Sequence, residues 1–241
     1  MLKPILAASA AAAFIAVPVS AQDYRYTDGV TPERWSDVQR DYAACDAGKM
    51  QSPVDLADAN AIGSVRIATA YGRSDGVLRL GRHKVQIDFQ PGQGMISGDR
   101  LFQLVQVHFH TPSEHAISGE RYPLTAHFVH ATPDGTLGVL GVMFEEGEAN
   151  PGLQAILDAA PGGDGTSVAL DVREMVPDDL DVYRYMGSLT TPPCSENVNW
   201  HVIEHALEAS SEQIAAMEAR LDMNARSLQP LNNRLLVAPE Q

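Results

Sequence analysis

The segment Leu104–His110 combines a strand pattern with two histidines that are separated by a single residue, and it constrains this chain more than any other stretch. Successive side chains of a β-strand point to opposite faces. One face should therefore carry Gln106, His108 and His110. The other face should point into a core and carry Val105, Val107 and Phe109. Two imidazoles placed in this way can reach one metal ion, and neutral imidazole suits Zn²⁺.

A third histidine lies in a second strand-like segment, Tyr122–His130. Alternation there puts Thr125, His127 and Val129 on one face and turns three residues away from it: Ala126, Phe128 and His130. A lone His-x-His on a strand is more often chance than a metal site. The third histidine instead favours a zinc site with three neutral ligands, in which a zinc-bound hydroxide is the nucleophile.

Short alternating or apolar runs, separated by Gly, Pro, Asn and Asp, predict strands in much of the first 150 residues. The clearest runs are 77–80, 85–89, 101–110, 125–130 and 139–144. Helical patterns are sparse: a start at Thr31-Pro32-Glu33, a segment Leu153–Ala159 and a segment Ser211–Leu221. Ser210 and Gln213 form a capping box for the last of these. The pattern predicts a strand-dominated α+β domain built on one large sheet.

The amino terminus reads as an export signal that is later removed. Lys3 precedes an apolar stretch, Ile5–Val19, and small residues follow at Val19-Ser20-Ala21. A membrane anchor is the alternative, but the stretch is shorter than the roughly 20 residues that a spanning helix needs. We therefore expect a signal peptide over residues 1–21, a single domain over residues 22–241, no membrane anchor, and a periplasmic or secreted protein.

Charge and cysteine content support this interpretation. The formal net charge of -14 disfavours binding to nucleic acid and to anionic membrane surfaces. The chain has two cysteines, Cys45 and Cys194. Exported proteins usually pair such thiols, so we predict one intramolecular disulfide.

Several motifs resemble the α-class carbonic anhydrases, in the form of the exported bacterial members. They are Gly48–Val54, Gln106–His115, Ala126–His130, Gly187–Pro193 and Gln229–Arg234. The resemblance covers nearly the whole chain after the signal. It implies a central twisted, mainly antiparallel sheet of about ten strands with short peripheral helices. It also implies reversible hydration of CO₂ to bicarbonate and a proton, with Zn²⁺ bound by His108, His110 and His127.

The resemblance also implies roles around the metal. Thr190 matches a threonine that accepts a hydrogen bond from the zinc-bound hydroxide and donates one to a carboxylate, which is matched by Glu114. Gln106 should accept from His108, and the backbone carbonyl of Asn232 should accept from His110. The residues that match the substrate pocket are Val129, Val139, Leu189, Thr191, Val198 and Trp200.

His83 matches the histidine that relays a proton between the metal site and buffer. Its surroundings, Leu80–Gln86, depart from the usual Asn-Asn-Gly-His, and Tyr26 and Gln86 are expected to help order solvent nearby. Thr125 stands where the family usually has a glutamate behind the third zinc histidine, so a threonine oxygen or a water should accept from His127 instead. Such changes commonly cost about 10- to 100-fold in metal affinity or activity.

The remaining histidines have structural interpretations. His115 and His130 should be structural, and His201 with His205 would form a metal pair only on a helix, whereas Val198, Trp200 and Val202 alternate as in a strand. Two other functions stay open: a noncatalytic binding module, and a zinc hydrolase that acts on esters, at least as a weak side activity. The expected partner is a small molecule, CO₂ or bicarbonate, and the expected state is a monomer or a homodimer.

Overall fold

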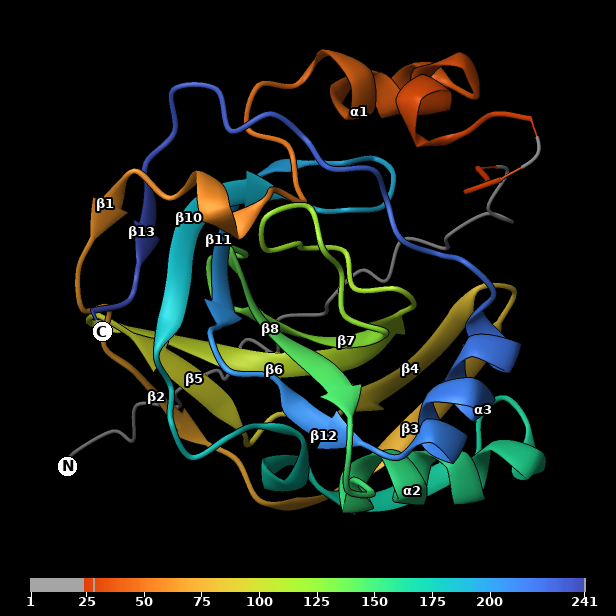
Figure 1. Cartoon of the computed structure of the whole chain (residues 1–241). Coiled ribbons are helices and arrows are strands. Elements are labelled where there is room, and N and C mark those ends of the chain that lie inside the picture. Colours follow the sequence, from red (N-terminus) through yellow and green to blue (C-terminus); the bar gives the residue numbers. More distant parts are fainter. Residues whose placement is uncertain (1–23, 28, 241) are drawn as a thin grey trace, which may run out of the picture.

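The computed structural model describes residues 24–27 and 29–240. The predicted signal peptide, residues 1–21, lies outside the described residues. The strands join in one 13-stranded sheet (Figure 1), whose main path runs β1-β13-β10-β11-β8-β7-β6-β4-β3-β9. In addition, β12 pairs with β8, and β5 joins β2 to β6. The predicted strand-dominated α+β fold is confirmed.

The strands have the following bounds: β1 (Ala61–Ile62), β2 (Ile67–Ala70), β3 (Arg73–Gly81), β4 (Lys84–Phe89), β5 (Gly94–Ser97), β6 (Arg100–His110), β7 (Leu124–Ala131), β8 (Leu137–Glu146), β9 (Ser167–Asp171), β10 (Val182–Ser188), β11 (Glu196–Ile203), β12 (Leu207–Ala209) and β13 (Leu236–Ala238). Parallel pairing joins β1 to β13 and joins β8 to β11 and β12. The other pairings are antiparallel. Each of the five clearest predicted strand runs lies within β3, β4, β6, β7 or β8.

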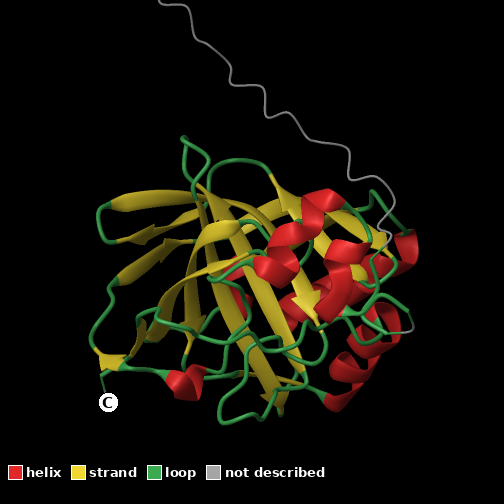
Figure 2. Ribbon diagram, turned by 90° about the horizontal axis from the view of Figure 1, so that it is seen from above, coloured by secondary structure: helices red, strands yellow, loops and turns green. Residues whose placement is uncertain are grey.

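The helices are short and lie around the sheet: α1 (Ala43–Ala47), α2 (Pro151–Ala159), α3 (Ser211–Leu221) and the 3₁₀ helices η1 (Pro32–Asp37), η2 (Arg40–Tyr42), η3 (Leu56–Asp58), η4 (Ala160–Gly162) and η5 (Val172–Met175). Seen from above, they gather mostly towards one side of the strands (Figure 2). The predicted capping box of α3 is present, since Ser210 and Gln213 bond to each other's backbone. The helix start predicted at residue 31 is a 3₁₀ helix.

Strand alternation divides the core into two layers, one on each face of the sheet. On β8, Leu140, Val142 and Phe144 join the larger cluster, while Val139 and Met143 join the smaller one. The larger cluster packs against α2 and α3 through Leu153, Ile156, Ile214 and Met217. The smaller cluster includes Trp200, whose ring lies beside that of His127.

Candidate functional site

The pairing of β6 with β7 brings the three predicted ligands together. His108 lies directly opposite His127 across this antiparallel pair, and His110 lies opposite Thr125. One ring nitrogen from each of His108, His110 and His127 lies within 4.8 Å of the others. The three side chains therefore converge on one point, as strand alternation predicts.

A β-bulge sets the faces of β6. Leu104 pairs with His130 and Gln106 pairs with Val129, so Val105 is an extra residue between two paired ones. The bulge allows Leu104 to point into the core and Gln106 to lie on the histidine face. Our prediction that Val105 points into the core is wrong: it is 41% exposed, because the bulge leaves it without a cross-strand partner.

The histidine cluster has the chemistry of a metal site. Burial, then the neighbours His110 and Lys84, lowers the pKa of His108 well below its usual value. Burial and the surrounding histidines do the same for His127. Both imidazoles are therefore neutral at physiological pH, the form in which a ring nitrogen can bind a metal ion. His110 Nε2 is buried without a hydrogen-bond partner among the described residues, as a nitrogen reserved for a metal would be. The donor set fits Zn²⁺.

Hydrogen bonds behind the cluster orient two of the rings. Gln106 Oε1 lies 2.9 Å from His108 Nδ1, as expected. His110 Nδ1 lies 2.8 Å from the backbone oxygen of Asn224, not of Asn232. The prediction for Asn232 is wrong because that residue lies in an exposed turn, where its side chain donates to Lys49 O.

Asn224 reaches the site because the chain passes the end of β6 directly after α3. Its side chain accepts from Thr111 N at 2.8 Å and donates to the carbonyls of His83 and Phe109 at 3.1 and 3.0 Å. It is 1% exposed. Asn224 is thus a supporting residue that the sequence analysis missed, since a single asparagine in an irregular segment carries no pattern.

His127 lacks such support. The Thr125 hydroxyl donates to Val142 O at 3.0 Å, and His127 Nε2 is buried without a hydrogen-bond partner among the described residues. The threonine oxygen therefore does not accept from His127. The departure noted in the sequence leaves one ligand without a protein partner.

Glu114 is buried beside the ligands, with Oε2 at 3.5 Å from His110 Nε2 and 3.8 Å from His127 Nδ1. Its Oε1 accepts from Arg226 N at 2.9 Å. Thr190 is 5% exposed, but no hydrogen bond joins it to Glu114 within the described part of the chain. The direct bond predicted between them is absent, since Oε2 faces the histidines and Oε1 is taken by Arg226.

Arg226 is a second supporting residue that the sequence analysis missed. Its side chain is fully buried and donates to Gln51 Oε1 at 2.9 Å, to Ser52 O at 2.7 Å and to Cys45 O at 2.5 Å. The residue therefore connects Glu114 to the amino-terminal segment and to the disulfide. That disulfide, Cys45–Cys194, is formed as predicted and joins α1 to the loop after Thr190.

An apolar wall lies beside the histidines. Val139, Val198 and Trp200 are buried in one cluster, and Val129 and Leu189 pack against it. The Trp200 ring lies 4.9 Å from the His127 ring, centre to centre. The predicted pocket residues therefore share one side of the site, apart from Thr191, which lines the cleft above the histidines.

The cleft above the histidines has a volume of about 180 Å³ and contains the predicted relay residue His83, together with Tyr26, Gln86 and Thr191. Two contacts hold the His83 ring. Nδ1 lies 2.9 Å from Leu221 O, and Arg82 Nε donates to Nε2 at 3.0 Å.

The other predicted structural histidines are not part of the three-histidine cluster, although the His115 ring lies 6.2 Å from the His127 ring. His115, His130 and His201 are buried and bond to hydroxyls of Tyr185, Tyr71 and Ser97 at 2.7, 2.7 and 2.8 Å. His201 lies on strand β11, and the side chain of His205 is 68% exposed beyond its end. The structural interpretations of these residues agree with their contacts.

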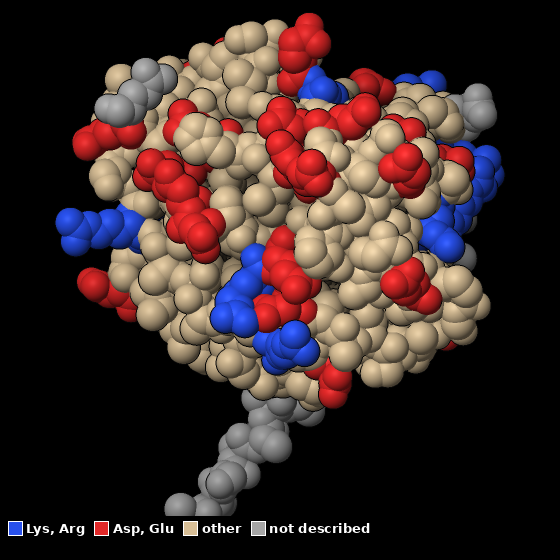
Figure 3. All heavy atoms as spheres, turned by 60° about the horizontal axis from the view of Figure 1, so that its bottom comes forward, with Lys and Arg blue, Asp and Glu red and all other residues tan. Residues whose placement is uncertain are grey.

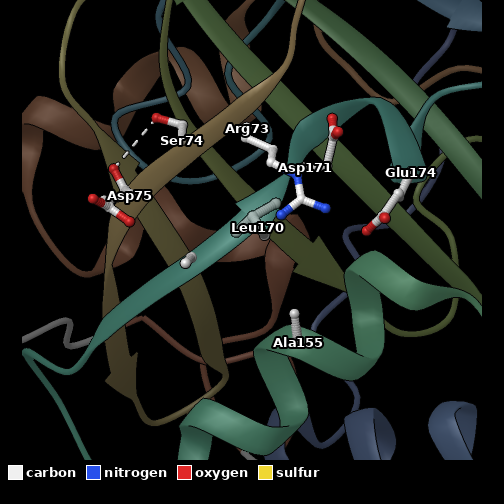
Figure 4. Close-up of a pocket in the computed structure, with 8 residues that line it drawn as sticks. Arg73, Ser74, Asp75, Ala155, Leu170, Asp171 and Glu174 are labelled. Carbon is white, nitrogen blue, oxygen red and sulfur yellow. Dashed lines mark hydrogen bonds between the residues drawn. The ribbon is translucent and has the colours of Figure 1, made fainter.

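A second hollow, of about 420 Å³, lies between β3, β9 and α2 (Figure 4). Arg73 points towards Asp171 there, and Glu174 lies beyond them. Arg173 pairs with Asp171. None of the predicted site residues lines this hollow, so the histidine cleft is the candidate site.

The fold and the cleft define a class of protein: a strand-dominated domain with three clustered histidines that could hold a metal ion and an apolar wall beside them. Comparison with known proteins gives the family. A sequence profile described as "Eukaryotic-type carbonic anhydrase" matches residues 30–239. A carbonic anhydrase of Nostoc sp. is 37% identical over 225 residues, which cover 89% of this chain and 85% of the relative. A carbonic anhydrase of Pectobacterium carotovorum is 33% identical over 229 residues, which cover 93% of this chain and 94% of the relative.

Solved structures agree. The α-carbonic anhydrase of Photobacterium profundum superposes with a TM-score of 0.82 at 37% identity, over 89% of this chain and all of that one. A dioscorin complexed with ascorbate also superposes, with a TM-score of 0.82 at 32% identity, over 91% of this chain and 99% of that one. The chain belongs to the eukaryotic-type, or α, carbonic anhydrase family, whose activity is the hydration of CO₂, and it is a lyase.

No helix in the described ranges has the length and hydropathy to cross a bilayer.

Proposed function

We propose that this protein catalyses the reversible hydration of CO₂ with a zinc ion held by His108, His110 and His127. The observation that carries the proposal is the convergence of three histidine nitrogens within 4.8 Å, beside a cleft that His108 and His110 line. When bound, zinc would act as a Lewis acid that lowers the pKa of a coordinated water to about 7 and so makes hydroxide available.

The chain's own residues would bind and orient the reactants. The apolar wall of Val129, Val139, Leu189, Val198 and Trp200 would hold CO₂ and exclude water, since CO₂ is apolar. Thr190, buried beside the wall, would orient the attacking oxygen. Glu114 would support this arrangement through its contacts with the ligands and Arg226.

His83 would carry the released proton from the cleft to buffer. Its place in the cleft supports the role, and the Arg82 contact at Nε2 means that this bond must open before that nitrogen takes a proton. Tyr26 and Gln86, in the same cleft, would order the solvent between His83 and the histidine cluster.

We also propose a periplasmic or secreted location, which the disulfide supports because such bonds persist in oxidising compartments.

Stopped-flow CO₂ hydration tests the function, with and without a zinc chelator. We expect metal-dependent hydration that His108→Ala abolishes. Ester hydrolysis under the same conditions tests the hydrolase alternative, and it should be the weaker activity because the wall leaves room only for a small apolar substrate. If the zinc-loaded protein hydrates no CO₂, the proposal fails and the noncatalytic binding module becomes the better explanation.

A further inference from the structure

The histidine cleft contains one side chain with a permanent formal charge. Its lining residues are Tyr24, Tyr26, His83, Lys84, Val85, Gln86, Gln106, His108, Phe109, His110, Thr191 and Asn224. No carboxylate is among them, and Glu114, whose Oε2 lies 3.5 Å from His110 Nε2, is fully buried and does not line the cleft. Lys84, the first residue of β4, therefore puts a positive charge in the cleft lining.

This charge contrasts with the rest of the protein. The net charge is -14, and Figure 3 shows acidic side chains spread over one face of the molecule. Lys84 is half-buried and makes no ion pair or side-chain hydrogen bond with the described residues. An ammonium group without a carboxylate partner can be compensated by an anion in the cleft.

The charge acts close to the metal ligands. Lys84 lines the cleft together with His108 and His110. It lies two residues before Gln86 on β4, and Gln86 pairs with His108, so strand alternation puts the Lys84 side chain on the histidine face of the sheet. The neighbouring Arg82 is bonded to His83, and Asp222 is an acidic residue near that histidine, at 3.7 Å and largely exposed. A cleft with low-dielectric walls focuses the field of the Lys84 charge and concentrates ions of opposite sign.

We propose that Lys84 is a specificity-determining residue that draws bicarbonate and other small monovalent anions into the cleft and holds them there. The inference rests on the proposed function, because bicarbonate is the anionic reactant of that reaction. CO₂ carries no charge, so Lys84 distinguishes between the two carbon species by charge.

The test uses thiocyanate and bicarbonate as probes on three variants: Lys84→Gln, Lys84→Arg and Lys49→Gln. Lys49 is the matched control, an exposed lysine outside the cleft whose loss changes the net charge equally. Dissociation constants come from the visible spectrum of the cobalt-substituted protein, and inhibition by thiocyanate comes from CO₂ hydration by the zinc-loaded protein.

We expect Lys84→Gln to raise the dissociation constants of both anions by about 3- to 10-fold, the effect of one charge in a partly desolvated cleft. Lys84→Arg should restore affinity to within about 2-fold, and Lys49→Gln should behave as the wild type. Added salt should weaken anion binding by the wild type more than by Lys84→Gln.

Equal dissociation constants for Lys84→Gln and Lys49→Gln would overturn the proposal, as would an arginine variant as weak as the glutamine variant. The two hypotheses fail separately. Wild-type protein that hydrates no CO₂ contradicts the proposed function, while the spectra still decide whether Lys84 controls anion binding.

Discussion

Thr125 shows how one side chain can change the surroundings of a candidate metal ligand. It lies opposite His110 on the neighbouring strand, and its hydroxyl is directed to the backbone of β8 rather than to His127. His127 Nε2 is consequently buried without a partner among the described residues. A ligand without such a partner is less firmly oriented and less basic.

We expect Thr125→Glu to slow zinc loss by about 10- to 100-fold, since a carboxylate can accept from His127 Nε2. Thr125→Val is the matched variant: it removes a hydroxyl that does not bond His127, so the rate should stay within about 2-fold of the wild type. Transfer of zinc to a chromophoric chelator measures both rates. The explanation is wrong if valine speeds zinc loss as much as glutamate slows it.

At the scale of elements, the supports of the site come from segments between strands. The chain after α3 supplies Asn224 to His110 and Arg226 to Glu114. The helix α3 must therefore end at a defined place. Its amino end is tied to α2, because Gln213 exchanges hydrogen bonds with the backbone of Asn150 at 2.8 and 2.9 Å.

This connection predicts unequal costs for the two residues of the capping box. Ser210→Ala should lower the free energy of unfolding by about 1 kcal/mol, the usual value of a helix cap. Gln213→Ala should cost more, about 2 to 3 kcal/mol, because it also leaves the buried Asn150 N–H without a partner and removes one of the two donors to Asn150 O. Urea denaturation measures both, with the exposed Glu218→Gln as the control. Equal losses would show that Gln213 acts only as a cap.

At the scale of the whole molecule, two features make the free energy of unfolding depend on solution conditions. One is the disulfide, which spans 149 residues in sequence. The other is a set of buried neutral histidines away from the metal site. Burial lowers the pKa of His130 to about 4 and of His201 to about 3.

Reduction of the disulfide should lower the free energy of unfolding by about 3 to 5 kcal/mol, since a loop of this length restricts the unfolded chain strongly. The double variant Cys45→Ser/Cys194→Ser should show the same loss, and reductant should have no further effect on it. Denaturation with and without dithiothreitol provides the measurement. A loss below about 1 kcal/mol would contradict the predicted stabilisation.

The buried histidines predict a loss of stability in mild acid. In the unfolded chain they bind protons below about pH 6.5, whereas the folded protein keeps His130 and His201 neutral until about pH 4 and 3. The unfolded state therefore binds more protons, and stability falls as pH drops from 6.5 towards 4.

His130→Gln should make this slope shallower by about 1.4 kcal/mol per pH unit, the contribution of one proton. His205→Gln, at an exposed position, should leave the slope unchanged. Unfolding free energies at several pH values between 6 and 4.5 test this prediction. If the unfolding free energies of the wild type and His130→Gln fall equally steeply with pH, His130 is not the source of the pH dependence.

Local patterns in the sequence were sufficient to predict several features of this protein. Alternation along 106–110 and 125–129 put the three ligand histidines on matching faces, and the pairing of β6 with β7 agrees with it. The capping box of α3 is equally local. The cysteine pairing followed from there being only two cysteines.

The loop residues that support the three histidines could not be predicted from local patterns and become evident in the folded chain. Asn224 and Arg226 lie more than 100 positions from His110 and Glu114, in an irregular segment without periodicity. The bulge at Val105 and the contact of His83 with Leu221 O also depend on how neighbouring segments pack. A strand's period gives the direction of each side chain, but the distant group that it meets is set by the path of the whole chain.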